Sequence, residues 1–159
     1  MGNSHDSIFR QPPLQGFRFL AKFLQFGIFP TPFDMWFSKV SGIGVSVDTR
    51  EIGSGGRNDY THKIPNHVNY ENLVLERGLT SGIPSDLDIN LLAMSQFKFA
   101  PGTVIVVVLN EASQPKRIWT FLKAYPTKWK IGDLDANQSG VLIETIELTY
   151  TQFLPLKLP

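Results

Sequence analysis

Segments in which apolar residues alternate with other residues constrain this chain more than any other feature of its sequence. From residue 16 to residue 26 the sequence reads GFRFLAKFLQF, and Phe17, Phe19, Ala21 and Phe23 share one face at a period of two. That period is typical of a half-buried β-strand, whereas a helix would repeat at 3.6 residues. This part of the chain is therefore predicted to be a strand.

Five further segments have strand character, because they are rich in β-branched and aromatic residues. A glycine kink at Gly42 and Gly44 is expected inside the first of them. Prolines at positions 30 and 32 exclude regular structure between residues 27 and 34. Asn110 to Pro115 is predicted to be a hairpin loop. The five segments read MWFSKVSGIGVSVDTREIG, VNYENLVLERG, TVIVVVLN, KRIWTFLKAYPTKWKI and GVLIETIELTYTQF.

One helix is predicted, over residues 85–99. Ser85 and Asp88 resemble a capping box, and Pro101 with the following glycine ends the segment. Its apolar stripe, at i, i+4 and i+7, consists of Leu87, Leu91 and Met94. Three strands, one helix and three strands, joined by short connections, predict an antiparallel β-sandwich or barrel with one flanking α-helix. The 159 residues suit one domain, 1–159, with residues 1–15 as an N-terminal extension.

Composition excludes several classes of protein. With 42% hydrophobic and 18% charged residues, the chain should fold. Because 15 basic residues nearly balance 14 acidic ones, the protein has no large net electrostatic field that would attract nucleic acid or an anionic membrane. The absence of cysteine removes disulfides and thiolate metal sites. The N-terminus lacks an export signal, and the longest apolar run, 104–109, is far shorter than the ~18 residues of a membrane span. We therefore expect a soluble protein.

The glycine-rich stretch GSGGRNDYTHKIP, residues 53–65, does not fit a phosphate-binding loop. A P-loop ends in Gly-Lys-Ser/Thr at a helix N-terminus, whereas Gly55-Gly56 is followed by Arg57 and then by a strand signal. The pair Gly42 and Gly44 also lacks the third glycine and the helix of a dinucleotide fingerprint. No cofactor is expected.

Two patterns could suggest a metal, and a polar loop or turn explains both. His62 and His67 have no cysteine or acidic ligand nearby. The segment DLDANQSGVLIE places oxygen-bearing residues at five positions of an EF-hand-like loop, but Gln138 stands where the loop needs glycine, and the flanks read as strands. No metal is expected, although calcium binding stays open as an alternative. The five residues are Asp133, Asp135, Asn137, Ser139 and Glu144.

The residue patterns that could form a catalytic site give equally weak evidence. Ser41 and Ser54 sit in glycine turns without the Gly-x-Ser-x-Gly elbow. The pairs Asp86/Asp88 and Glu144/Glu147 could do acid–base work, but solvated faces of a helix start and a strand explain them as well. The sequence thus predicts a protein that is not an enzyme.

Residues 48–65 read as a long loop, charged and rich in glycine, with almost no apolar residue to hold it to a core. A loop longer than ~12–15 residues without structure of its own is usually functional or disordered. The residues alone leave both interpretations open: a flexible surface loop, or a loop that reaches a partner.

Three segments resemble the inner-tube protein family of contractile phage tails and extracellular contractile injection systems. They are SKVSGI (38–43), GGRNDYTHKIPNHVNYENLVLERGL (55–79) and WTFLKAYPTKWKIGDLDANQSGVLIETIELTY (119–150). The order of these motifs carries the resemblance, which extends from about Phe17 to Tyr150.

The resemblance implies a structural subunit that forms hexameric rings, whose sheets join into a continuous tube wall and which stack into a tube. It also implies partners: adjacent tube rings or a paralogous tube protein, and sheath and baseplate or spike proteins, with no specific nucleic acid and no membrane in the resting state. Assembly in the bacterial cytoplasm, as part of a phage tail or an extracellular tail-like particle, follows from the same likeness. A water-filled lumen would explain polar strand positions, namely Lys123, Thr145, Glu147 and Thr149.

In that family the loop corresponding to residues 48–65 reaches the neighbouring subunit and the adjacent ring. We therefore predict that it contains the inter-subunit and inter-ring contacts Arg50, Glu51, Arg57, Asp59, Tyr60 and Lys63. The segment FGIFPTPFDMWF is more apolar than a tube subunit requires, and Asn66 replaces an expected glycine. Both departures leave open whether the chain forms the trunk tube or a baseplate-proximal initiator ring.

Two other classes compete with this interpretation. One is a free-standing ligand-binding β-sandwich, in which Trp36, Trp119, Trp129 and Tyr125 would line a pocket. The other is a hydrolase whose site is not recognisable from the sequence.

Overall fold

The computed structural model describes residues 18–24, 33–53, 61–79, 96, 100–133 and 140–156. Within these ranges the elements are strands, and no helix there is long and apolar enough to cross a membrane. The predicted N-terminal extension, 1–15, and the predicted helix, 85–99, lie outside the described residues except for Gln96. The strands are β1 Arg18–Leu24, β2 Phe33–Phe37, β3 Lys39–Ser41, β4 Val45–Gly53, β5 Thr61–Tyr70, β6 Leu73–Gly78, β7 Gly102–Leu109, β8 Pro115–Ile131, β9 Ile143–Thr149 and β10 Gln152–Leu156.

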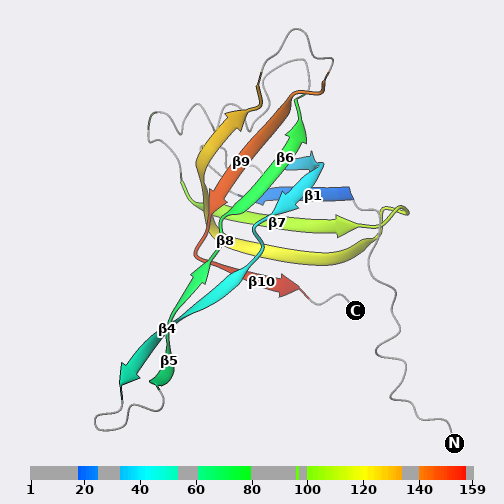
Figure 1. Ribbon diagram of the computed structural model, residues 1–159. Coiled ribbons are helices and arrows are strands. Elements are labelled where there is room, and N and C mark those ends of the chain that lie inside the picture. The colour runs from blue at the N-terminus through cyan, green and yellow to red at the C-terminus, as the bar shows by residue number, and fades with distance from the viewer. Residues whose placement is uncertain are drawn as a thin grey trace, which may run out of the picture.

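Eight of these strands form one antiparallel sheet that folds over a core. Its order is β2-β1-β7-β8-β9-β6-β3, with β10 also paired to β8. We call β1, β2, β7, β10 and residues 115–124 of β8 sheet A, and β3, β6, β9 and residues 125–131 of β8 sheet B. Figure 1 shows the strands of the two sheets crossing at a large angle. Strands that bend from one sheet into the other make the corners of such packings.

One corner lies at Ser38, which is all that separates β2 from β3. β2 pairs with β1 at one end of the strand order, and β3 pairs with β6 at the other end. The Ser38 backbone N–H and hydroxyl both donate to the carbonyl of Glu76, at 2.9 and 3.0 Å. A single bent strand therefore brings the two ends of the sheet together into a barrel-like closure.

The second corner lies in the middle of β8. Pairing with β7 runs from Pro115 to Ala124, and pairing with β9 begins at Tyr125. Lys123, immediately before this change of partner, has a φ of +52°, in the left-handed region that side chains rarely adopt. The long strand thus changes sheets through a strained residue rather than through a loop.

Side chains alternate between the core and the outside along each strand of the two sheets. On β7, for example, Val104 and Val106 are fully buried whereas Ile105 between them is partly exposed. The buried side chains from both sheets form one cluster. Its members are Ala21, Phe23, Met35, Phe37, Leu73, Leu75, Val104, Val106, Phe121, Ala124, Ile146, Leu148 and Tyr150.

The predicted antiparallel β architecture is confirmed, and so is the hairpin loop at 110–115, where the Asn110 and Ser113 backbone N–H groups donate to Gln114 and Asn110. The prediction of six strands is corrected to ten strands in the described residues. The second segment divides into β2, β3 and β4, because the chain bends at Ser38 and because Gly42, with a φ of +78°, then turns it out of the barrel. The third segment, VNYENLVLERG, breaks at 71–72 between β5 and β6, and the last segment breaks at 150–151 into β9 and β10.

An ion pair closes one end of the core. Glu144 is fully buried, and its carboxylate accepts hydrogen bonds from Arg77 Nε and, at 2.8 Å, from Trp129 Nε1. Arg77 also lies 3.9 Å from the sulfur of Met35. The pair therefore links β6, β8, β9 and β2 at the point where the barrel ends.

Replacement of Gly42 by alanine should destabilise the protein. A Cβ at this position would lie 1.8 Å from the Asn72 carbonyl oxygen, and the positive φ adds strain. We expect a loss of about 1–3 kcal/mol in the free energy of unfolding, measured by denaturant titration. Gly53→Ala is the control, since a Cβ added there meets no atom of the other described residues within 4 Å, its chain neighbours apart; equal losses in both variants would contradict the strain at Gly42.

Replacement of Arg77 by methionine should cost more, because it leaves the Glu144 carboxylate buried without its cation. A loss of about 3–5 kcal/mol in the free energy of unfolding is expected. The double variant Arg77→Met/Glu144→Leu should regain most of it, since a well-packed apolar pair can replace a buried ion pair. A double variant as unstable as the single one would mean that Arg77 acts through its packing and not through its charge.

Candidate functional site

Strands β4 and β5 form a hairpin that projects from the barrel, as Figure 1 shows. They make a two-stranded sheet of their own, and every residue of both strands is exposed. We call this hairpin, residues 45–53 and 61–70, the arm. An isolated two-stranded ribbon is marginally stable in water, so an arm of this length is expected to gain support from a partner.

The arm corrects the prediction of a structureless loop at 48–65. Most of that segment pairs as two strands, from Asp48↔His67 to Gly53↔Thr61, and only residues 54–60 lie outside the described part of the chain. The segment was mistaken for a loop because its charged and polar residues suit a ribbon that is solvated on both faces. A strand signal that depends on one buried face is absent from such a ribbon.

Apolar side chains on the arm form two patches on opposite faces. Asn66 is an extra residue in β5, where the register shifts between Asp48 and Thr49. Counting alternation along the register, the base patch on one face consists of Val45, Val47 and Val68. The tip patch, on the other face, consists of Ile52 and Ile64. All five are exposed large hydrophobic residues.

Aromatic packing fixes the root of the arm to the barrel. The Tyr70 ring lies 5.8 Å from that of Tyr150 and 5.7 Å from that of Phe153, centroid to centroid, and Phe121 lies beneath them. The Tyr150 hydroxyl is buried and has no hydrogen-bond partner among the described residues. Burial, with smaller contributions from Glu71 and Tyr70, raises the pKa of Tyr150 to about 12. This tyrosine therefore stays neutral and acts as part of the core.

Three of the six predicted contact residues lie on the described part of the arm. Glu51 and Lys63 are cross-strand partners whose charged atoms are 3.6 Å apart, both on the face of the base patch. Arg50 lies on the opposite face, beside Ile64. Arg57, Asp59 and Tyr60 lie outside the described residues. Since Glu51 and Lys63 are mostly exposed, their pairing contributes little stability and leaves both available to a partner.

The outer face of sheet B is polar. Register places Lys39, Glu76, Thr145 and Lys130 side by side across four strands, with Lys39 Nζ 2.9 Å from Glu76 Oε1. In the next rows Asn72 donates to Glu147 at 2.7 Å, and Thr149 donates to Asn72 at 3.0 Å. Thr145, Glu147 and Thr149, predicted to face water, all lie on this face. The fourth predicted position, Lys123, lies at the bend of β8 instead.

The four aromatic residues proposed to line a ligand pocket do not gather in one place. Trp36 is exposed on the outside of sheet A, and Trp119 packs against the core. Trp129 donates a hydrogen bond to Glu144, and Tyr125 pairs with Thr149 where β8 enters sheet B. A hollow at the edge of the barrel includes only Trp36 of the four. Its lining consists of Arg18, Asp34, Met35, Trp36, Phe37, Ser38, Arg77 and Gly78.

The structure also separates Glu144 from Glu147, the carboxylate pair that the sequence suggested for acid–base chemistry. Glu144 points into the core and Glu147 away from it, so they cannot act together as an acid and a base. Glu144 is also the twelfth position of the calcium-like pattern, and both of its oxygens already accept hydrogen bonds. Residues 134–139 and the pair Asp86/Asp88 lie outside the described residues. In the described part of the chain no three potential ligands gather around a common point.

Several solved structures share this fold. The chain is 35% identical to a chain in the structure of the anti-feeding prophage (AFP) baseplate, with a TM-score of 0.81 over 92% of this chain and 97% of that one. It is 21% identical to a chain in the sheath-tube complex of PVC, an extracellular contractile injection system, with a TM-score of 0.76 over 99% and 100%. Hcp1 from Salmonella typhimurium shares the fold at 11% identity, with a TM-score of 0.57 over 87% and 85%.

A search of curated protein sequences found no significant match. Residues 15–154 match the family described as T4-like virus tail tube protein gp19. The resemblance that the sequence motifs carry is thereby confirmed, and the agreement extends over nearly the whole barrel and the arm. The chain belongs to the T4-like virus tail tube protein family.

Proposed function

We propose that this tail tube protein forms hexameric rings that stack into the inner tube of a contractile injection machine, and that its ring lies next to the baseplate. The observation that supports ring formation is that sheet B has two edge strands, each paired on one side only among the described strands. From Tyr125 to Ile131, β8 pairs with β9 alone among the described strands. At the other end of the sheet, β3 pairs with β6 alone in the same part of the chain.

Open strand edges invite pairing with another chain. When the β8 edge of one copy joins the β3 edge of the next, the contact is heterologous, and a constant rotation between copies closes it into a ring. Sheet B then becomes part of a continuous wall. Its polar outer face, with Lys39, Glu76, Lys130 and Glu147, suits contact with the water of a lumen.

The arm supplies the second kind of contact. In a closed ring it extends beyond the barrel of its own subunit and can cover a neighbour with the base patch, because Val47 and Val68 lie opposite each other at 53% and 55% exposure. The six predicted contact residues, from Arg50 to Lys63, belong to this proposal. Burial of exposed valines on assembly would provide the hydrophobic contribution that the charged residues lack.

Placement next to the baseplate is supported by the unequal identities. The chain shares 35% of its residues with a chain from the six-fold symmetrised AFP baseplate, but only 21% with chains from the PVC sheath-tube complex and the AFP tube cap. A trunk subunit should resemble the trunk and cap chains at least as closely. Sheath and baseplate or spike proteins, along with trunk rings of a paralogous tube protein, are the partners that this position implies.

Electron microscopy of the purified chain should reveal six-fold rings, and loss of the base patch should abolish them. The variant Val47→Ser/Val68→Ser should keep the circular dichroism spectrum of the parent, because both side chains are exposed, while its rings fall to monomers in size-exclusion chromatography. Val141→Ser is the matched control, an exposed valine at 74% that lies off the arm. Intact rings from the double valine variant would overturn the role of the arm.

Stacking can be tested separately with the predicted contact residues that lie between β4 and β5 in the sequence. We expect Arg57→Ala/Asp59→Ala to leave the subunit folded but to prevent tube growth, since two charged inter-ring contacts are removed. Tube lengths counted in electron micrographs provide the measurement. Tubes as long and as numerous as those of the parent chain would exclude these residues from the contact between rings.

A further inference from the structure

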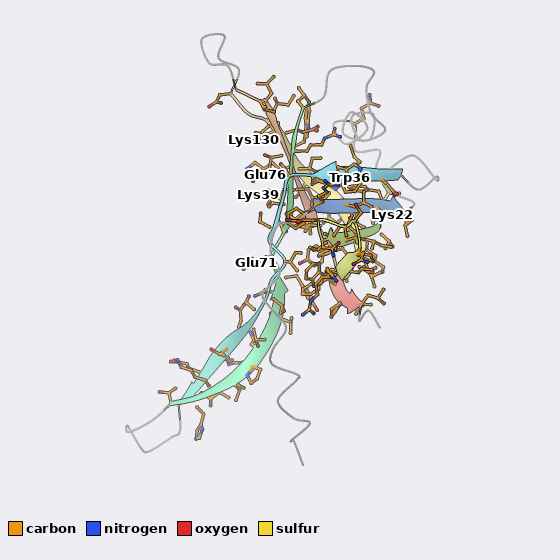
Figure 2. The ribbon with its side chains drawn as sticks, turned by 90° about the vertical axis from the view of Figure 1, so that its right-hand side faces the viewer. Lys22, Trp36, Lys39, Glu71, Glu76 and Lys130 are labelled. Atoms are coloured by element: carbon orange, nitrogen blue, oxygen red, sulfur yellow. The ribbon has the colours of Figure 1, made fainter. Side chains whose placement is uncertain are left out.

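Charged side chains on the outer face of sheet B differ between its edge strands and its inner strands. The lysines lie on the two edge strands, Lys39 on β3 and Lys128 and Lys130 on β8. The carboxylates lie on the two inner strands, Glu76 on β6 and Glu147 on β9. Figure 2 shows Lys39, Glu76 and Lys130 along one side of the barrel. Each edge of this face is therefore cationic, and its centre is anionic.

A hollow on this face gathers both lysines of β8. In the register Lys128 lies opposite Glu147 and Lys130 lies opposite Thr145, so all four side chains point away from the core. The hollow is polar throughout. Its lining consists of Glu76, Lys128, Lys130, Thr145 and Glu147.

The carboxylates of this face are engaged, whereas the lysines of β8 are not. One carboxylate accepts a hydrogen bond from Lys39 Nζ at 2.9 Å, and the other accepts one from Asn72 at 2.7 Å. Lys128 and Lys130 are exposed, and their ammonium groups have no ion-pair or hydrogen-bond partner among the described residues. Both ammonium groups are therefore available to a ligand.

Ring closure would bring the two cationic edges together. This step rests on the proposed function, in which the β8 edge of one copy pairs with the β3 edge of the next. Neighbouring strands of sheet B are all antiparallel, and the joined edges continue that alternation. Because Val40 packs against the core, only registers that step by two residues are allowed, and these put Lys39 on the same face as the lysines of β8.

We call the junction of these two edges the seam; it joins Lys39 of one copy with Lys128 and Lys130 of the next. Side chains directly opposite each other have Cβ atoms ~4.5–5.5 Å apart and diagonal neighbours ~7–8 Å, and like charges in such positions are destabilising. An anion held among the ammonium groups would relieve the repulsion and accept charge-assisted hydrogen bonds. A ligand that binds the closed seam and not the separate subunit favours the ring.

We propose that each seam binds carboxylate groups of an acidic polypeptide in the lumen, and that this polypeptide stabilises the closed ring. Glu76 and Glu147 lie between successive seams, so cationic and anionic bands alternate around the lumen. A nucleic acid carries charge at every nucleotide and would be repelled by the anionic bands. A polypeptide can space its carboxylates to match the seams, and its uncharged groups can hydrogen-bond to Asn72, Thr145 and Thr149 in between.

Ring assembly with and without poly-L-glutamate tests this coupling. The full chain is diluted in series at low ionic strength, and the fraction in rings is measured by mass photometry and electron microscopy. We expect poly-L-glutamate to lower the protein concentration at half assembly by about tenfold or more, because it binds only the closed seam. Poly-L-lysine of equal length should not lower it. At 1 M NaCl, where the Debye length is ~3 Å, the effect of poly-L-glutamate should vanish.

The variant Lys128→Gln/Lys130→Gln identifies the seam as the site. With two charges removed from each seam, its rings should form at lower protein concentration than parental rings, and poly-L-glutamate should no longer shift them. Lys116→Gln/Arg117→Gln is the matched control, since it removes the same charge from exposed residues of β8 that lie in sheet A. The control should respond to poly-L-glutamate as the parent chain does.

Parental rings that are indifferent to poly-L-glutamate would overturn this inference and leave the proposed ring intact. An equal response in the Lys128/Lys130 variant and in the parent would also overturn it, because the ligand would then bind elsewhere. An oligonucleotide that promotes rings more strongly than poly-L-glutamate of equal charge would overturn the assignment to a polypeptide. A chain that forms no rings under any of these conditions would overturn the proposed function, and this inference with it.

Discussion

Closure of the barrel by one bent strand is the constraint on which the rest of this structure depends. β2 and β3 are separated only by Ser38, yet they pair with β1 and β6, which lie toward opposite ends of the sheet. Ser38 makes both of its hydrogen bonds to Glu76, and the buried Arg77–Glu144 pair lies next to this corner. Because the corner is fixed, the chain leaves β3 in one direction, and Gly42 then directs it outward into the arm.

The sequence was sufficient to predict the strands that have one buried face. Alternation identified β1, and β-branched and aromatic content identified the segments of β7 and β9, from which Val104 and Ile146 fill the core. Parts of β4 and β5 fell inside longer predicted strand segments, but residues 48–65 were read as a loop, because both faces of the arm are exposed and neither is buried against a core. Alternation also missed the two corners, because neither Ser38 nor Lys123 has an intrinsic preference for a change of sheet. Those bends come from pairing partners distant in the sequence.

The exposed surfaces could likewise be predicted from the sequence only where a single strand carries the pattern. Thr145, Glu147 and Thr149 were identifiable as an outward polar row, because they alternate with core residues on β9. The apolar row on the outer face of sheet A was not identifiable, because its members come from strands far apart in the chain and become neighbours only through the register. They are Trp36, Leu20, Val107, Ile118 and Leu156. Met35, Trp36 and Phe37 read as one apolar run, but pleating sends the first and last into the core and leaves the tryptophan outside. Tertiary pairing, and not composition, decides which apolar residues remain available to partners.

The shared strands also determine how the wall carries a load. Three segments pass from one sheet into the other: β2 into β3, β8 through its own bend, and β9 into β10. In a sandwich joined only by side-chain packing, a shearing force can slide one layer over the other. Here any sliding would stretch covalent backbone at three corners. In a tube built from this subunit, covalent backbone would connect the two sheets and help the wall to resist axial thrust. A simple sandwich would have only van der Waals contacts between its sheets.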